Sequence, residues 1–305
     1  MSALKCKSSV TLIIGIITTL LFIPIWYTML VPSAIVSALE KIDITTSYEG
    51  IWEFSSDPIS ILMKAHVYVE EVKGENIILK FEVNTTSLNA TLPELSGNST
   101  YVINKFTREN IISAPEADKP RKGYDYFYPL HLKAGEGIPY AWLDNLNTVA
   151  TLEFREKIVE EGVTLYKYFA EKTITTVMFV EGMGVRNVTL AATKNILIEP
   201  LSGLWAYTEK ETLHLGDVDV IMQLLYLEYK STAEAKAQGL ANAKAAYDSM
   251  QLLELYVPLI LGVIIVVLTI ALAYNVRRLK RKKLHEPKPN FQRLHSFRVR
   301  TIPSK

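Results

Sequence analysis

Cysteine is nearly absent from this chain, since Cys6 is the only one among 305 residues. A single cysteine excludes an internal disulfide framework. Ectodomains of animal proteins of this size usually carry several disulfides, so the absence favours a prokaryotic protein. Cys6 precedes an apolar run and could be acylated beside a membrane, with a plain free thiol as the alternative.

Catalytic motifs are also lacking. The chain contains no His-x-x-x-His, Cys-x-x-Cys, Gly-x-Ser-x-Gly or P-loop pattern. We therefore predict a protein that is not an enzyme, with no cofactor and no metal site. Asp217 and Asp219 could offer oxygen ligands to Ca²⁺, but a turn between strands explains them equally well. A glycosidase-like pair of carboxylates stays open, because pairing in space is not visible in a sequence.

Charge is missing from two long apolar runs, residues 10–31 and 255–276. A helix of that length spans about 33 Å at ~1.5 Å per residue, close to the ~30 Å hydrocarbon core of a bilayer. We predict two transmembrane helices. For the first run, a signal peptide cleaved after Val36-Ser37-Ala38 is the alternative, although the run exceeds the usual apolar length of about 7–15 residues.

Basic residues gather at the end of each run that lies nearer to a chain terminus. Lys5 and Lys7 lie before the first run, and six follow the second: Arg277, Arg278, Lys280, Arg281, Lys282 and Lys283. The positive-inside rule then predicts a cell-membrane protein with both termini, 1–9 and 277–305, in the cytoplasm. The six basic residues are candidates for contact with anionic lipid.

The segment between the runs, 32–254, carries a net charge of −11, against +10 for the tail 277–305. An acidic ectodomain is a poor partner for anionic polymers, so we expect no nucleic-acid binding. The lipid bilayer is the expected partner.

Alternation of apolar and polar residues over 77–83 is typical of a strand. Turn residues predict three hairpins, which pair 66–72 with 77–83, 150–159 with 163–170, and 175–180 with 185–190. Further strands are expected at 196–199, 204–215 and 221–229. Residues 32–230 are therefore predicted to form a mainly β ectodomain, an antiparallel sheet or a barrel-like domain.

An alanine-rich juxtamembrane helix is predicted at 231–254, capped by Ser231 and Thr232. Its small residues recur every four positions, at Ala233, Ala237, Ala241 and Ala245. Small residues at the same spacing follow the first run, at Ser33, Ala34, Ser37 and Ala38. Such ridges allow close helix pairing, and one interpretation is a paired-helix stalk. The alternative is an amphipathic helix lying on the β domain.

An aromatic patch is the most prominent candidate for ligand binding: Tyr124, Tyr126, Phe127, Tyr128, Tyr140 and Trp142. Ordinary β core is the alternative. Arg121 and Lys122 precede the patch, where they could meet an anionic headgroup or simply be solvated. Four N-glycosylation acceptor patterns begin at Asn84, Asn89, Asn98 and Asn187, and three of them fall in 84–100, which is expected to be an exposed loop.

These features resemble the PorA-like family of actinobacterial and archaeal membrane proteins. The resemblance lies in the turn Glu199-Pro200-Leu201-Ser202-Gly203, the tract from Gly137 to Asp144, and the strand from Glu161 to Tyr168. It implies a membrane protein of a family that is mostly of unknown function. The two-span layout is also similar to the CD36-type receptors, whose β domain is tunnelled for lipids, a likeness of architecture alone.

The leading hypothesis is a non-enzymatic, membrane-anchored envelope protein that binds or helps transfer a lipid or other apolar molecule. The alternative is a structural or adaptor subunit that contacts itself or other membrane subunits. A hydrolase on the outer face is a third hypothesis. A closed apolar tunnel would favour the first, a solid core the second and converging buried carboxylates the third.

Overall fold

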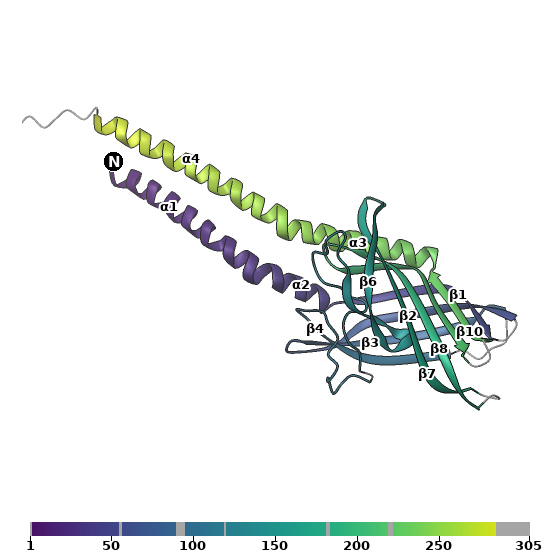
Figure 1. The fold of residues 1–305 in the computed structure, drawn as a ribbon. Coiled ribbons are helices and arrows are strands. Elements are labelled where there is room, and N and C mark those ends of the chain that lie inside the picture. The colour runs from purple at the N-terminus through teal and green to yellow at the C-terminus, as the bar shows by residue number, and fades with distance from the viewer. Residues whose placement is uncertain are drawn as a thin grey trace, which may run out of the picture. The chain divides into compact units, whose positions relative to one another are not determined.

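The computed structural model describes residues 2–54, 57–89, 95–118, 120–180, 184–218 and 222–284. The chain falls into two compact units, Met1–Thr28 with Val257–Lys305, and Met29–Tyr256 (Figure 1). The first boundary falls within a short π-helical segment, η1 (Trp26–Leu30), and the second falls at the end of another, η3 (Leu252–Tyr256). Proline lies two residues from each segment, at Pro24 and Pro258. Because proline removes a helical hydrogen bond, it favours such local irregularity.

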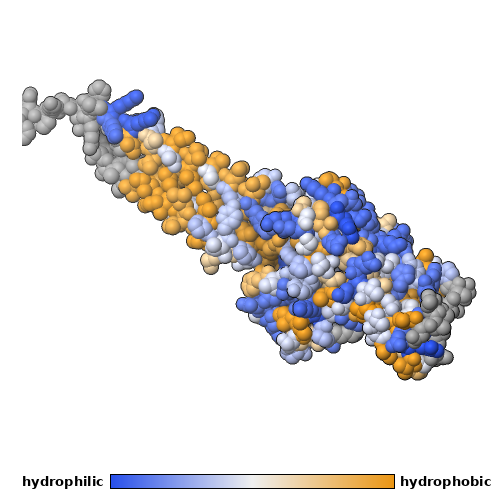
Figure 2. Space-filling model, in the orientation of Figure 1, coloured by the Kyte–Doolittle hydropathy of each residue, from blue (hydrophilic) through white to orange (hydrophobic). Residues whose placement is uncertain are grey.

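The first unit is a pair of long helices, α1 (Ser2–Ile25) and α4 (Val257–Leu284), which pack against each other. Their apolar side chains are largely exposed, as the continuous hydrophobic surface in Figure 2 shows. By length and composition, the helical stretches Val10–Leu39 and Ala233–Arg278 each contain a segment apolar enough to cross a membrane. The two expected apolar helices are therefore present.

The second unit is built on one antiparallel ten-stranded sheet in the order β4-β3-β2-β1-β10-β9-β8-β7-β6-β5. Its strands are β1 (Asp43–Phe54), β2 (Asp57–Lys73), β3 (Asn76–Ser87), β4 (Leu95–Asn104), β5 (Ile138–Leu143), β6 (Thr148–Glu160), β7 (Val163–Val180), β8 (Gly184–Glu199), β9 (Leu204–Asp217) and β10 (Met222–Ser231). A 3₁₀ turn, η2 (Asp144–Leu146), joins β5 to β6. Strands thus dominate this unit, as the sequence predicts.

The three predicted hairpins are confirmed as the ladders β2–β3, β6–β7 and β7–β8. The prediction was wrong in dividing β7 and β8, which are continuous strands that absorb two predicted segments each. It was also wrong in treating 84–100 as a loop, because β3 continues to Ser87 and β4 begins at Leu95. Polar Thr, Ser and Asn side chains hide a strand from a hydrophobicity pattern when they lie at an exposed sheet edge.

The edge strands β4 and β5 are connected through the segment between them. Single antiparallel bridges join Ile103 of β4 to Asn110, and Asn110 to Gly123; a parallel bridge joins Tyr124 to Ala141 of β5. The sheet is curled, since Ala65 of β2 shares one core cluster with residues of β6 and β7. This curvature gives the sheet a concave side on which the main core lies.

Helix α3 (Ala233–Gln251) lies on the sheet. Leu240 and Ala243 are buried against Leu165 and Ala206 in a separate cluster. Thr232 caps the helix by accepting a hydrogen bond from the Ala235 amide at 3.2 Å, as predicted. The predicted ridge of Ala233, Ala237, Ala241 and Ala245 is instead exposed. The alternative interpretation, an amphipathic helix on the β domain, therefore describes α3.

Helix α2 (Val31–Leu39) precedes β1 and ends within the β domain. Val31, Val36 and Leu39 are buried. Leu39 packs in a cluster with Val67 and Ile77. The small residues that we expected to form a ridge are not the ones that anchor this helix.

Candidate functional site

The concave side of the sheet contains a cavity of about 350 Å³. Ligand sites commonly occupy about 300–1,000 Å³, so this one suits a small molecule. Gly97, Asn98 and Ser99 of β4 line it together with Asp144 and Asn145 of η2. The cavity therefore reaches the gap between the first half of β4 and the η2 turn.

The second half of β4 is covered, which explains why the gap is confined to the first half. The Thr100 amide donates to the Asp118 carboxylate at 2.7 Å, and the Asp118 amide donates to the Thr100 carbonyl at 3.0 Å. Thr100 to Ile103 are buried, whereas Leu95 to Asn98 are exposed. Among the described residues, β4 pairs only with β3 over this first half, so an open strand edge borders the cavity on this side.

Arg121 is the centre of a buried ionic network at the cavity wall. Its guanidinium donates to Asp125 at 2.7 Å and lies 3.0 Å from Asp144. It also stacks on the ring of Tyr101 at 4.6 Å. Lys194 of β8 reaches the second oxygen of Asp125, Oδ1, at 3.8 Å. That oxygen is buried and has no hydrogen-bond partner among the described residues.

A second polar row crosses the sheet beside this network. Lys194 of β8, Glu211 of β9 and Tyr229 of β10 are successive cross-strand partners. Directly opposed side chains on one face lie close enough to interact. Glu211 accepts a hydrogen bond from Asn145 at 2.9 Å, and Asn145 also reaches the Tyr229 hydroxyl at 3.4 Å. Asn145 thus links η2 to the row.

Burial shifts the ionisation of these groups. Removal from water raises the pKa of Asp125 to about 7, and the nearby Asp144 acts in the same direction. Burial also raises the pKa of Glu211. For Lys194, burial opposes the charged form, but Tyr128, Glu211 and Asp125 outweigh it and raise the pKa of the ammonium group. Lys194 therefore stays a cation at neutral pH.

Aromatic rings form a continuous wall of the same cavity. Tyr48 meets Tyr229 edge-on with ring centres 5.5 Å apart, and it lies 6.4 Å from Trp205. Trp205 meets Tyr126 at 6.1 Å, and Tyr126 stacks on Phe81 at 5.8 Å. These separations are typical of favourable aromatic pairs. All five residues line the cavity.

The predicted aromatic patch is only partly at this site. Tyr126 and Tyr128 line the cavity. Trp142 is buried and its indole N–H donates to Asp144 at 3.1 Å, so it positions a lining carboxylate. Phe127 belongs to a core cluster. These four residues support both interpretations of the patch, as a site and as β core.

The other two aromatic residues lie elsewhere. Tyr124 donates its hydroxyl to Glu109 at 2.9 Å. Tyr140 is exposed, beneath the ammonium group of Lys122 at 4.9 Å. Arg121, for which we expected solvent or a headgroup, is buried with Asp125.

Sequence reasoning missed most of the cavity: Tyr48, Asp125, Asp144, Asn145, Lys194, Trp205, Glu211 and Tyr229. The sequence gives no clear signal for these residues, because Glu211 directly follows two exposed charged residues of β9, Glu209 and Lys210. Charges are rarely buried without partners. The opposition of Lys194 and Glu211 also depends on strand register.

The Glu199–Gly203 turn holds the loop that carries Tyr126 and Tyr128. The buried Glu199 carboxylate accepts from the amides of Leu201 at 2.9 Å and Ser202 at 2.6 Å. The buried Arg108 guanidinium donates to the carbonyls of Tyr128 and Ser202. The turn that carries the family resemblance is therefore a structural clasp.

Gly203 completes the clasp. Its φ is +67°, and a Cβ there would lie 2.3 Å from the Tyr128 carbonyl oxygen. The Tyr128 amide donates to the Gly203 carbonyl at 2.9 Å. Only glycine allows this approach without strain.

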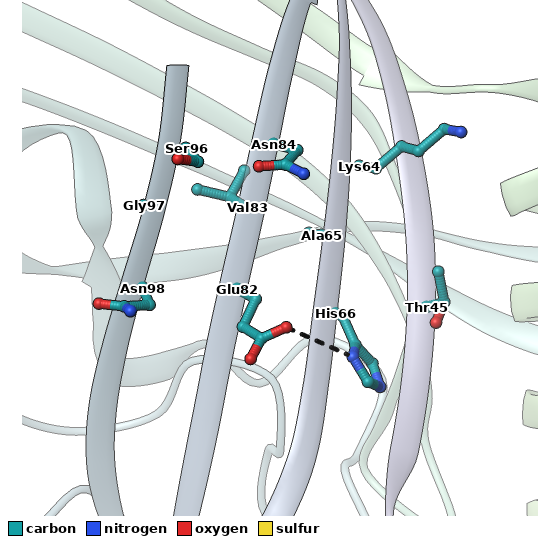
Figure 3. A pocket seen from close by; sticks show the side chains of 10 residues that line it. All are labelled: Thr45, Lys64, Ala65, His66, Glu82, Val83, Asn84, Ser96, Gly97 and Asn98. Atoms are coloured by element: carbon teal, nitrogen blue, oxygen red, sulfur yellow. Dashed lines mark ion pairs between the residues drawn. The ribbon is translucent and has the colours of Figure 1, made fainter. Parts of the chain in front are cut away.

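A larger hollow of about 580 Å³ lies on the outer face of β1–β4 (Figure 3). Exposed polar side chains line it, including two of the candidate N-glycosylation sites, Asn84 of β3 and Asn98 of β4. His66 lies 2.7 Å from Asp43 and 3.9 Å from Glu82. This shallow trough buries none of its charges, so it is a weaker candidate than the interior cavity.

The remaining candidate N-glycosylation sites are Asn89 and Asn187. Asn89 accepts from the Ser60 amide at 2.8 Å and donates to the Pro58 carbonyl at 3.1 Å. Its Thr91 lies outside the described residues. Asn187 is exposed on β8.

Asp217 is buried, with Arg186 at 3.8 Å, whereas Asp219 lies outside the described residues. Within the described ranges, no group of three His, Cys, Asp or Glu side chains is placed to hold a metal. The predicted lipid contacts Arg277, Arg278, Lys280 and Arg281 are exposed on α4. Lys282 and Lys283 continue the same helix.

Comparison with protein families gives a match to the family described as Porin PorA over residues 81–274. The match runs from β3 into α4 and includes the clasp and most of the cavity wall. No curated protein matches the chain. The family and the two candidate spans both fit a membrane protein. Since the match covers well over half of its length, the chain belongs to the Porin PorA family.

Proposed function

We propose that this chain is a two-span membrane protein whose β domain, outside the cytoplasm, binds a small polar ligand in its interior cavity without chemical turnover. The observation that carries the proposal is the buried Oδ1 of Asp125, a residue of the cavity wall, which has no hydrogen bond among the described residues. An unsatisfied buried acceptor costs about 1–3 kcal/mol, and more when charged. A ligand that donates to this oxygen would recover that free energy.

The cavity lining supports a polar rather than an apolar ligand. The sequence favours a lipid or apolar envelope molecule, but an acyl chain here would leave Asp125, Lys194 and Glu211 against hydrocarbon. Burying such groups without partners is strongly unfavourable. The aromatic wall can still contact the apolar parts of a polar ligand.

The absence of turnover is also part of the proposal. Arg121 binds both Asp125 and Asp144, and Asn145 binds Glu211. Each carboxylate is thereby held by a protein donor, an arrangement suited to holding charge in place. The third hypothesis, a hydrolase, predicts products after incubation with ligand, which mass spectrometry would detect.

The orientation follows from the basic residues around Arg278 and the positive-inside rule. The native thiol provides a test in intact cells. A membrane-impermeant maleimide should label Asn98→Cys on exposed β4, and should label Cys6 only after permeabilisation. The opposite pattern would reverse the topology.

Native mass spectrometry of the full chain in detergent tests the binding role. We expect a small non-lipid adduct that is lost in Asp125→Asn and kept in Asp43→Asn, a control at an exposed carboxylate of β1. A protein that is ligand-free in every preparation and binds nothing in a polar-ligand panel would refute the proposal.

A second candidate function is a structural or adaptor role. The specific observation is the apolar end of the β7–β8 hairpin, where Val177, Phe179 and Val185 are 61%, 74% and 71% exposed. Exposed apolar patches often mark contacts with other proteins. A photoreactive residue in place of Phe179 should then form a defined adduct in cells, and a monomeric product alone would exclude this role for the hairpin.

A further inference from the structure

The cavity holds more negative than positive charge. Arg121 and Lys194 supply two cations, against the three carboxylates of Asp125, Asp144 and Glu211. At a pH above the raised pKa values of Asp125 and Glu211, all five groups are ionised and the lining carries a net charge of −1. An unbalanced charge inside a protein is unfavourable, so an empty cavity favours the arrival of a cation or a proton.

The two protein cations are already engaged at one end of the lining. Arg121 is bound to Asp125 and Asp144, and Lys194 lies within 4 Å of Asp125. Glu211 has no ion pair within that distance among the described residues, and its hydrogen bonds come from the neutral groups of Asn145 and Tyr229. Glu211 is only 4% exposed. Lys194 is thus shared between Asp125 and its cross-strand partner Glu211, and Glu211 is the lining carboxylate that has no ion pair of its own among the described residues.

Aromatic rings line the same cavity as this carboxylate. Tyr229 is its cross-strand partner on β10. Tyr48 packs edge-on against Tyr229, and Trp205 lies next to Tyr48. The faces of Tyr and Trp rings attract cations, and rings combined with a carboxylate are suited to ammonium groups.

Resting on the proposed function, we propose that the ligand is an organic ammonium ion, held between Glu211 and the rings of Tyr48, Tyr229 and Trp205. An N–H or a hydroxyl of the same ligand donates to Oδ1 of Asp125, which has no hydrogen bond among the described residues. A bound monocation brings the lining to neutrality. The small volume restricts the ligand to an amine or alkylammonium of low mass.

Other classes of ligand fit less well. A bound monoanion would make the net charge of the lining −2. It would also meet no lining cation that is without a carboxylate partner among the described residues. A neutral sugar could donate to Asp125 and stack on Trp205, but it would leave Glu211 uncompensated. The Glu211 carboxylate, which has no ion pair of its own among the described residues, therefore favours an ammonium ion over a polyol as the ligand.

The test is calorimetry on the full chain in detergent with matched probes. The panel contains methylammonium, tetramethylammonium, choline and putrescine; 3,3-dimethylbutan-1-ol, the uncharged isostere of choline; and glucose and acetate. We expect at least one ammonium ion to bind, and choline to bind at least about tenfold more tightly than its isostere, in line with a cation–π and ionic contribution.

Variants locate the site. Glu211→Gln should weaken binding about tenfold or more, whereas Glu209→Gln, on the outer face of the same strand, should not change it. Tyr48→Phe keeps the ring and should retain affinity, and Tyr48→Leu should lose it. Circular dichroism spectra check that each variant is folded, and the choline–isostere comparison in the wild type needs no variant.

The outcomes separate the two proposals. Equal affinity for choline and its isostere, or binding of glucose or acetate with no ammonium ion bound, overturns this inference and leaves a polar-ligand site standing. Failure of every probe to bind overturns the inference. If native mass spectrometry also finds only ligand-free protein, the proposed function fails with it.

Discussion

Replacing Arg121 by methionine should destabilise the β domain markedly. Arg121 is 7% exposed and donates to Asp125, whose side chain is almost fully buried, at 2.7 Å. Its second partner, Asp144, is 38% exposed and is partly solvated, so its contribution is small. Methionine keeps most of the apolar contact but leaves the Asp125 carboxylate without its closest cation.

The magnitude follows from this burial. Breaking a buried ion pair from one side costs about 3–5 kcal/mol, and Lys194 remains at 3.8 Å, so we expect the lower end, about 3 kcal/mol. At about 2–4 °C per kcal/mol for a domain of this size, the melting temperature should fall by roughly 6–12 °C. The assay is thermal unfolding of the full chain in detergent, followed by circular dichroism at a pH above 7.

Arg155 provides the matched control. It also pairs with a carboxylate, Glu153 at 3.0 Å, and lies over an aromatic ring, Phe169 at 4.7 Å, but its side chain is 48% exposed. Arg155→Met should change stability by about 0.5 kcal/mol or less. Adding Asp125→Asn to Arg121→Met should recover most of the loss, because the uncompensated charge is removed. Equal melting temperatures for Arg121→Met and Arg155→Met would refute the reasoning.

Three further outcomes are expected. Folding raises the pKa of Asp125 to about 7, so the stability that its protonation contributes is complete below about pH 4 and is lost as the pH rises through 7. Asp125→Asn should therefore flatten that part of the curve of melting temperature against pH. An unchanged curve would contradict the assignment. Gly203→Ala should destabilise the β domain far more than Gly74→Ala, because both glycines have positive φ but only Gly203 lies against carbonyl oxygens. Equal decreases in melting temperature for the two variants would show that the clasp carries no strain. Gly239→Ala places a Cβ 1.8 Å from the Ala206 carbonyl oxygen, so amide exchange in α3 should accelerate, and unchanged exchange would argue against close packing on β9.

The sequence was informative where one element decides the outcome. The uncharged runs indicate apolar helices without knowledge of the fold. Alternation over Ile77–Val83 indicates β3, and Thr232 marks the start of α3. Each of these signals depends on neighbours along the chain, which a sequence displays directly.

The cavity was not predictable for the opposite reason. Glu211 meets Lys194 and Tyr229 only through the registers of β8–β9 and β9–β10. A slip of one residue would turn each of these side chains to the other face of the sheet. The ladder between β8 and β9 contains two register shifts, so even correct strands would not have paired these residues by counting. The site is a property of the register.

The clasp connects the two kinds of information. Glu199 and Gly203 lie close together in sequence, which makes their turn recognisable, yet neither residue lines the cavity. The clasp acts by fixing the Tyr128 backbone through Arg108 and the Gly203 carbonyl. A motif of this kind can persist while the lining changes, because it constrains where the loop lies and not which side chains the loop presents. The family match over 81–274 includes both the clasp and Glu211, but the ligand that we propose depends on residues outside the motif, above all Glu211.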